Sequence, residues 1–222
     1  MATDGARRRF VLEHTALAAP PLVPEIELHL AAEVDPLWHA TQAWLDDHDL
    51  PPPFWAFAWP GGIALARLIL DGVIDVRGRS VVDLASGSGL VAIAAARAGA
   101  ARVRAVDLDP FATAATIENA ARSGVVVDAL TADAASAPDA DITLAGDVFY
   151  DAMIAECMIS TLAARAARGS LVYAGDPQRT YAPAGWTVAR AIEVPTSLEL
   201  EGTPSKTTRV LTPPPGRAPL AP

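Results

Sequence analysis

The nine residues Val81-Val82-Asp83-Leu84-Ala85-Ser86-Gly87-Ser88-Gly89 decide the fold of this chain. An apolar run contains an acid near its end, a loop of small residues follows, and an Ala-rich stretch with helical spacing begins at Leu90. This order predicts a β-strand, a tight turn and the N-terminus of a helix. Glycine lets the backbone approach a ligand closely, and the first turn of a helix has unpaired N–H groups. The turn is therefore a candidate site for a nucleotide-type cofactor.

Strand and helix patterns alternate after this turn, which predicts a mostly parallel sheet with helices on both faces. The last two strand patterns, 188–194 and 207–211, have no helix between them and are expected to pair as a hairpin. We therefore expect an α/β fold: a Rossmann-like, doubly wound, mostly parallel seven-stranded sheet with an antiparallel C-terminal hairpin and a small N-terminal helical arm. The other predicted strands are 80–84, 102–106, 125–131, 142–145 and 171–174, and the helices are 63–71, 90–98, 110–123 and 151–167.

The first sixty residues predict an arm or cap, 1–60, that precedes a cofactor-binding domain at 61–222. The patterns indicate a helix at 7–18, a short strand or extended segment at 25–30, a helix at 36–47 and a stiff proline linker at 51–53. The segment 54–59 contains four aromatic residues. It is interpreted either as a hinge packed on the core or as a wall of the binding site.

Composition limits the class of partner. Hydrophobic residues make up 51% of the 222 residues and charged residues 19%, which is typical of a globular protein. The formal net charge of −9 argues against nucleic acid, whose phosphates need clustered cations. A basic protein or a cationic substrate suits this charge, although the charge can also serve solubility alone.

The apolar runs and the single cysteine bear on the compartment of the protein and on whether it binds a metal. No uninterrupted apolar run is long enough to span a bilayer, so no membrane association is expected. No apolar stretch follows Arg7-Arg8-Arg9, and no secretory signal is expected. The single cysteine, Cys157, lies in a helical pattern and is predicted to be a buried thiol. One cysteine fits a reducing compartment, so we expect a cytoplasmic protein without a metal site.

Acidic residues follow the predicted strands, and ligands in such folds bind at the carboxyl ends of the strands. ATP and GTP are disfavoured because the chain lacks a GxxxxGK[ST] motif. NAD is a rival, since Gly87, Gly89 and Ala92 fit G-x-G-x-x-A and Asp107 lies twenty residues after Gly87. Two features argue against NAD: Asp83 would face a pyrophosphate of like charge, and no conspicuous cation follows the strands. S-adenosylmethionine, a phosphate-free sulfonium cation, fits the acids better.

The first motif resembles that of the class I, seven-β-strand methyltransferases, D-x-G-x-G-x-G. Residues 83–89 follow this pattern, with Ala85 in place of the first glycine. The resemblance implies that Asp107 binds the ribose hydroxyls of S-adenosylmethionine and that Asp133 and Ala134 lie against its adenine. The implied cofactor-binding residues are Trp59, Gly61, Asp83, Ala85, Ser86, Gly87, Gly89, Asp107, Leu108, Asp133, Ala134 and Asp147.

A second motif narrows the resemblance. Asp147-Val148-Phe149-Tyr150 is similar to the D/E-x-x-Y/F motif of methyltransferases that modify lysines of non-histone proteins. Together with 52–62 and 20–26, it resembles the electron transfer flavoprotein β-subunit lysine methyltransferase family. The resemblance implies a protein-lysine N-methyltransferase, with Asp147 and Tyr150 catalytic and with Trp59 and Gly61 near the methionine end of the cofactor. The implied partner is a lysine-containing basic segment of the flavoprotein β subunit.

Three alternatives stay open at this point. A small-molecule N-methyltransferase would use the same chemistry on a free amine. An NAD-dependent oxidoreductase would use the glycine turn for a pyrophosphate. A binding module without catalysis would use the acids to dock a partner.

Overall fold

A computed structural model describes residues 4–31 and 52–214 of the chain. The predicted helix at 36–47 lies outside the described residues, as does the first proline of the predicted linker. No helix within the described ranges is both long and apolar enough to cross a membrane.

The core of the molecule is a seven-stranded sheet in the order β5-β4-β3-β6-β7-β9-β8. The first five strands in this order are parallel, and β9 pairs antiparallel with both β7 and β8. The predicted fold, including the C-terminal hairpin, is confirmed. The strands are β3 (Ser80–Leu84), β4 (Arg102–Asp107), β5 (Asp128–Thr131), β6 (Ile142–Gly146), β7 (Leu171–Asp176), β8 (Thr187–Pro195) and β9 (Ser205–Thr212).

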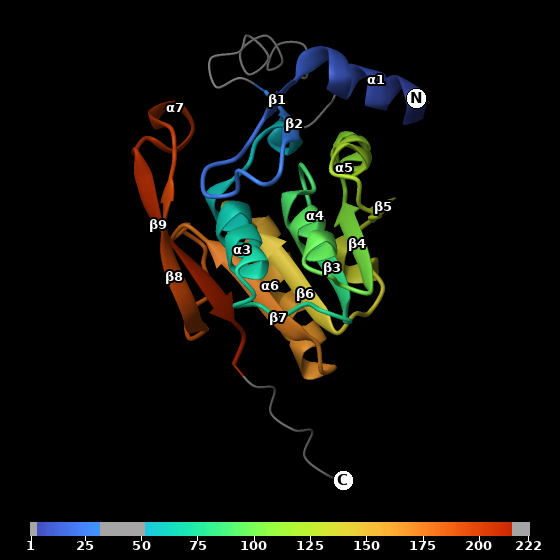
Figure 1. Cartoon of the computed structure of the whole chain (residues 1–222). Coiled ribbons are helices and arrows are strands. Elements are labelled where there is room, and N and C mark those ends of the chain that lie inside the picture. The colour runs from blue at the N-terminus through green and yellow to red at the C-terminus, as the bar shows by residue number, and fades with distance from the viewer. Residues whose placement is uncertain (1–3, 32–51, 215–222) are drawn as a thin grey trace.

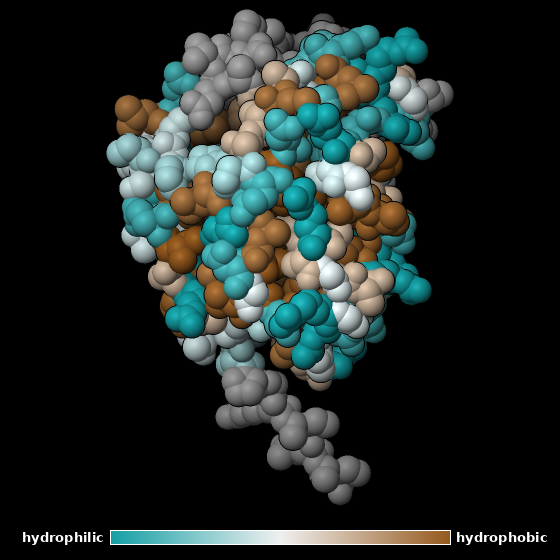
Figure 2. Space-filling view, in the orientation of Figure 1, coloured by the Kyte–Doolittle hydropathy of each residue, from teal (hydrophilic) through white to brown (hydrophobic). Residues whose placement is uncertain are grey.

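Helices cover both faces of this sheet (Figure 1). Alternate residues of β3 show why: Val81 packs in the core formed with α3 and α4, whereas Val82 and Leu84 pack in the core formed with α6. On the face that α3 and α4 cover, apolar and polar residues are interspersed (Figure 2). The helices are α3 (Pro60–Leu70), α4 (Leu90–Arg97), α5 (Pro110–Arg122), α6 (Ala152–Ala167) and the short α7 (Leu198–Glu201), with 3-10 turns η1 (Phe54–Ala56) and η2 (Ala134–Ser136).

The connections define a switch point between β3 and β6. The chain runs outward from β3 to β4 and β5, and then returns to the other side of β3 to form β6 and β7. Leu84 and Ala145 are register partners, so the segments that follow them leave the sheet side by side. Ligands of open α/β sheets bind in the crevice at such a point.

The N-terminal arm differs from its prediction. Helix α1 (Asp4–His14) ends at His14, and Ala16–Ala18 forms strand β1, which pairs with β2 (Leu28–Leu30). The predicted helix was wrong for residues 15–18, because pairing with the buried strand β2 overrides the helix propensity of Ala and Leu. Figure 1 shows α1 beside α5.

The described part of the arm shares the core of the main domain. Val23, Ile26 and Leu28 are fully buried and pack in the same cluster as α3 and α4. The domain boundary at residue 60 stays a prediction, but no separate core of the arm is present within 4–31. The prediction for Cys157 was wrong: it is exposed, because α6 buries the opposite face through Ala155, Met158, Leu162 and Arg165.

Candidate active site

The turn between β3 and α4 has the backbone shape that a close ligand requires. Ala85, Gly87 and Gly89 have positive φ angles of 54°, 52° and 81°. Gly89 is tightly packed, since an added Cβ would lie 2.8 Å from Oγ1 of Thr116 on α5. At Gly87 an added Cβ would meet, among the described residues, only the Cα of Trp55 at 3.8 Å. The space over Gly87 supports the prediction that a ligand approaches the backbone there.

Asp107, at the end of β4, holds this turn. Its Oδ2 accepts a hydrogen bond from the Gly87 backbone N–H at 2.9 Å, and its Oδ1 accepts one from Asp109 at 3.0 Å. Ser86 closes the turn by accepting a bond from the Gly89 N–H at 2.8 Å. Burial raises the pKa of the Asp107 carboxyl, and the backbone N–H donors oppose that rise. The structure thus places a carboxylate beside the glycine turn, where ribose hydroxyls would need an acceptor.

Asp83 lies beneath the turn and is only 1% exposed. Its Oδ2 accepts a hydrogen bond at 3.1 Å from the N–H of Ala92, in the first turn of α4. Burial raises the pKa of Asp83 to about 8, the Ala92 bond lowers it, and the charge of Asp107 raises it. The argument that Asp83 faces a bound pyrophosphate does not hold, because the side chain is turned into the protein. Asp83 shapes the turn by capping α4, since the N-cap residue Gly89 has no side chain to do so.

Asp147 caps α3 in a similar way and is 7% exposed. Its Oδ2 accepts hydrogen bonds from the N–H groups of Gly61 at 2.5 Å and Gly62 at 3.2 Å. The N-cap residue Trp59 supplies no side-chain cap, so a carboxylate distant in sequence does. Asp147 also has a left-handed backbone, with φ of 58°, a region that Asp enters more readily than most residues. Burial raises the pKa of Asp147 to about 6, although Arg179 and Gly61 lower it.

Three glycines bring the start of α3 against the ends of β6 and β7. An added Cβ on Gly61 would lie 2.3 Å from the carbonyl oxygen of Gly175, and one on Gly175 would lie 2.1 Å from that of Gly61. An added Cβ on Gly146 would lie 2.8 Å from the N of Gly62. Gly61 was predicted to bind the cofactor, and the structure gives it a packing role that accounts for the glycine by itself. This close packing fixes the position of Asp147.

Aromatic side chains form one side of the site. The rings of Phe54 and Tyr150 are 5.4 Å apart, and those of Phe54 and Trp59 are 6.1 Å apart. The Trp59 Nε1–H donates to the Phe54 carbonyl at 2.9 Å, which ties η1 to the start of α3. Tyr150 is 44% exposed, and burial of its hydroxyl and the charge of Asp107 raise its pKa. The two predicted catalytic residues, Asp147 and Tyr150, therefore share a site with Phe54 and Trp59.

The predicted adenine-binding residues follow β5. Asp133 accepts a hydrogen bond from the Ala135 N–H at 2.7 Å and so begins η2. Arg165 of α6, 1% exposed, donates to the carbonyls of Ala137 at 2.6 Å and Pro138 at 3.1 Å and holds this segment. The structure shows Ala134 partly buried and Leu108 70% exposed.

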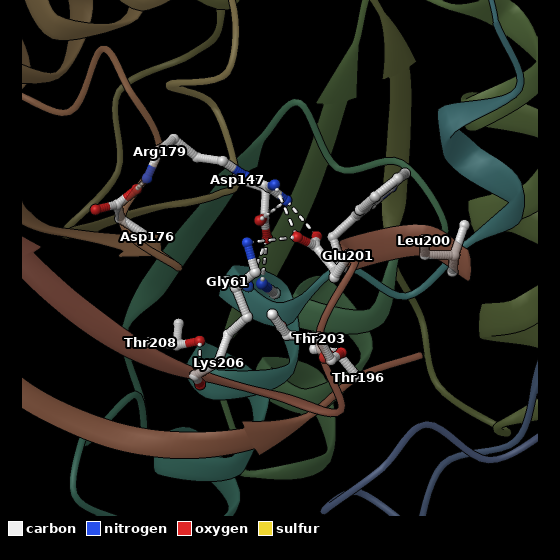
Figure 3. A network of polar contacts seen from close by, with 12 residues as sticks. Gly61, Asp147, Asp176, Arg179, Thr196, Leu200, Glu201, Thr203, Lys206 and Thr208 are labelled. Carbon is white, nitrogen blue, oxygen red and sulfur yellow. Dashed lines mark hydrogen bonds and ion pairs between the residues drawn. The ribbon is translucent and has the colours of Figure 1, made fainter. Parts of the chain in front are cut away.

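The sequence did not point to Arg179 and Glu201, which the structure brings to Asp147. Arg179 follows β7 and donates to Oδ1 of Asp147 at 2.9 Å. Glu201 ends α7, has a side chain 3% exposed, and accepts two hydrogen bonds from Arg179. Figure 3 shows this network. Sequence spacing carries no signal for it, because its three members lie on separate connections that only the folded hairpin brings together.

The residues present fit S-adenosylmethionine. The glycine turn leaves backbone space at the switch point, Asp107 offers acceptors for a diol, and the aromatic group suits a sulfonium and its methyl group. When bound, this cofactor supplies a methyl group activated by a positive sulfur. Fold and site together define an S-adenosylmethionine-dependent methyltransferase.

Comparisons with known proteins identify the family. Residues 65–170 match the family described as Ribosomal protein L11 methyltransferase (PrmA). The chain is 37% identical over 180 residues to an electron transfer flavoprotein β-subunit lysine methyltransferase of Xenopus laevis, covering 78% of this chain and 70% of the relative. A homolog of that methyltransferase from Caenorhabditis elegans is 32% identical, with 78% of each chain covered. The chain belongs to the electron transfer flavoprotein β-subunit lysine methyltransferase family.

A solved structure shows the same fold. The magnesium protoporphyrin IX methyltransferase of Synechocystis PCC 6803, with bound S-adenosylmethionine, aligns with a TM-score of 0.52 at 20% identity over 68% of this chain and 79% of its own. The resemblance inferred from residues 83–89 and 147–150 is thus confirmed at the level of family and fold. The NAD-dependent oxidoreductase is not favoured.

Proposed function

We propose that this chain methylates lysine side chains of the electron transfer flavoprotein β subunit, with S-adenosylmethionine as methyl donor. The relatives that carry this activity in their names cover most of the chain. The observation that carries the proposal is the position of Asp147: a buried carboxylate at the switch point that caps α3, the helix preceded by Trp59, whose ring is grouped with those of Phe54 and Tyr150. A carboxylate and aromatic faces are the groups that recognise an ammonium and its methylated forms.

Methyl transfer needs a neutral amine. A lysine with a pKa of about 10.4 must lose a proton before it can attack, which costs about 4.6 kcal/mol at pH 7. Transfer into an aromatic, partly desolvated site lowers the pKa of the amine, and solvent can take the proton. Asp147 then accepts an N–H of the neutral amine and directs the nitrogen lone pair at the methyl group. Alignment and desolvation supply the rate in this mechanism, without a strong base.

Partner and compartment belong to the same proposal. The net charge of −9 favours a basic segment around the target lysine, through long-range attraction. We place the enzyme in the cytoplasm, on the basis of its lone exposed Cys157, which a reducing compartment keeps as a thiol.

The test is transfer of labelled methyl from S-adenosylmethionine to purified flavoprotein β subunit, with peptide mapping of the label. Asp147→Asn keeps an oxygen for the α3 cap and removes the charge. We expect it to reduce turnover about 100-fold, the scale of a misaligned nucleophile, with little change in S-adenosylhomocysteine affinity by calorimetry. Asp139→Asn, which alters an exposed carboxylate paired with Arg168, is the matched control and should keep full activity. Full turnover by Asp147→Asn would remove Asp147 from the mechanism, and label on a free amine but not on protein would favour a small-molecule enzyme.

A further inference from the structure

Arg179 is held by groups from three other parts of the fold: Asp147 after β6, Glu201 of α7 and Trp59 before α3. Its guanidinium donates once to Asp147, and it donates twice to Glu201, at 2.6 and 3.0 Å. Its Cζ lies 5.9 Å from the centre of the Trp59 ring. An arginine held by two bonds to one carboxylate presents its remaining N–H groups in a fixed direction. Here that direction is toward Asp147 (Figure 3).

The segment that carries Arg179 is itself fixed. Asp176, fully buried at the end of β7, accepts a hydrogen bond from the Arg179 backbone N–H at 2.8 Å. The other oxygen of Asp176 accepts a bond at 2.6 Å from Arg209 on β9. Strands β7 and β9 therefore fix the backbone position of Arg179, and α7 fixes the position of its guanidinium.

We propose that Arg179 and Glu201 act as positioning residues for methyl transfer: together they fix the orientation of the Asp147 carboxylate and its charge. The proposal rests on the proposed function, in which Asp147 faces the substrate amine. The geometry gives the reason, since α3 holds Oδ2 and Arg179 holds Oδ1, so rotation of the carboxylate is blocked at both oxygens.

Charge gives Arg179 and Glu201 opposite effects. Arg179 stabilises ionised Asp147 against burial, whereas the negative charge of Glu201 opposes that ionisation. Glu201 is in turn paired with Lys206 of β9, whose Nζ lies 3.1 Å from Oε2. Among the described residues, the groups that act on Asp147 are thus the N–H groups of Gly61 and Gly62 on α3, Arg179 after β7, and Glu201 on α7 with its partner Lys206. A residue that merely supports the fold has no reason to shift the titration of Asp147 in a particular direction.

The experiment compares pH profiles of kcat/KM for methylation of the β subunit, which report ionisations of the free enzyme. Arg179→Met is expected to move the Asp147 ionisation upward by about 1–3 pH units, the usual effect of losing an adjacent cation. Because the pKa of Asp147 is about 6, activity at pH 7 then falls about 2-fold for a rise of one unit and about 90-fold for a rise of three, and it partly returns at pH 9. Glu201→Gln is expected to move the same ionisation downward. Arg179→Lys keeps the positive charge, so the Asp147 ionisation should stay at the same pH. Its kcat should fall, because lysine cannot make the paired hydrogen bonds with which Arg179 is held by Glu201.

The control and a second measurement keep folding effects apart. Arg168→Met, which breaks an exposed pair with Asp139, should leave the profile unchanged. Because Glu201 is buried, its variant is also studied by ¹³C NMR titration of labelled aspartate, a measurement that needs no turnover. The Asp147 signal is assigned as the one that Asp147→Asn removes. Shifts in the same direction, or no shift in either variant, overturn the inference. Absence of methylation by the unaltered enzyme refutes the proposed function instead, while the NMR titration still tests the pairing.

Discussion

Gly61 and Gly62 are neighbours in the first turn of α3, and only one has room for a side chain. An added Cβ on Gly61 would lie 2.3 Å from the Gly175 carbonyl oxygen and 2.4 Å from Oδ2 of Asp147. On Gly62 the nearest atom of the residues that the structure describes is Cγ2 of Val91 at 3.6 Å, an ordinary contact. Close packing therefore requires glycine at position 61, whereas position 62 has room for a larger residue.

Alanine at these two positions should have opposite consequences. Gly61→Ala is expected to lower the free energy of unfolding by about 1–3 kcal/mol and to reduce methylation, because α3 must move away from Asp147. Gly62→Ala is expected to raise it by up to about 1 kcal/mol, since alanine favours a helix over glycine. Urea unfolding followed by Trp fluorescence measures both. Equal stability of the two variants would contradict the close approach of α3 to β7.

At the scale of elements, the sequence located segments whose boundaries are set locally. The helix predicted at 110–123 begins at the same residue as α5, and the Asp109 side chain just before it accepts a bond from the Phe111 N–H at 2.8 Å. Strand β3 agrees with its predicted residues. Helix α3 begins three residues before its predicted start, because its cap comes from Asp147, far away in sequence.

In the site, too, the features formed by neighbouring residues could be predicted, and those formed by residues distant in sequence could not. The glycine turn and Asp107 could be predicted because a strand, a turn and a helix are contiguous in sequence. Arg179 and Glu201 could not, since their contact depends on how the β8–β9 connection folds over the ends of β6 and β7. The burial of Asp83 could not be predicted for a related reason: the pattern places an acid near the end of a strand, but does not show that the first turn of α4 lies above it.

The N-terminal arm is expected to stabilise the main domain. Val23, Ile26 and Leu28 are fully buried in the core with α3 and α4, and Arg67 of α3 pairs with Glu25 at 2.9 Å. Burying three such side chains stabilises the fold by about 5 kcal/mol or more, which is comparable with the whole stability of a domain. Removal of residues 1–31 should therefore lower the thermal midpoint sharply or prevent folding. An unchanged midpoint, with loss of activity on protein substrate alone, would show that the arm serves only recognition.

At the scale of the whole molecule, buried acids link stability to pH. The pKa of Asp83 is about 8 in the folded protein, above its ordinary value of about 3.9 in an unfolded chain. The folded state therefore binds a proton that the unfolded state releases between about pH 4 and pH 8, and stability falls as pH rises through this window. Asp147 and Asp109, each with a pKa of about 6, add smaller contributions with the same sign.

Asp83→Asn should flatten this fall. The amide keeps an oxygen for the Ala92 N–H and never ionises, so the variant loses less stability than the parent between pH 5 and pH 8. Urea unfolding at these two pH values measures the difference. S-adenosylhomocysteine affinity should change little, because the side chain is buried under the turn. An unchanged pH dependence would show that Asp83 is ionised in the folded protein.

The strand order has a consequence for folding during synthesis. β9 lies between β7 and β8, although both are made before it on the ribosome. Until residues 205–212 emerge, β7 presents an open edge that can pair with other chains, and Arg209, Lys206 and Glu201 are not yet in place. The nascent protein thus lacks the Arg209 partner of Asp176 and the Lys206 partner of Glu201 until strand β9 has been made. We therefore expect chains stalled on the ribosome before residue 205 to associate with other chains through β7 more readily than the full chain does.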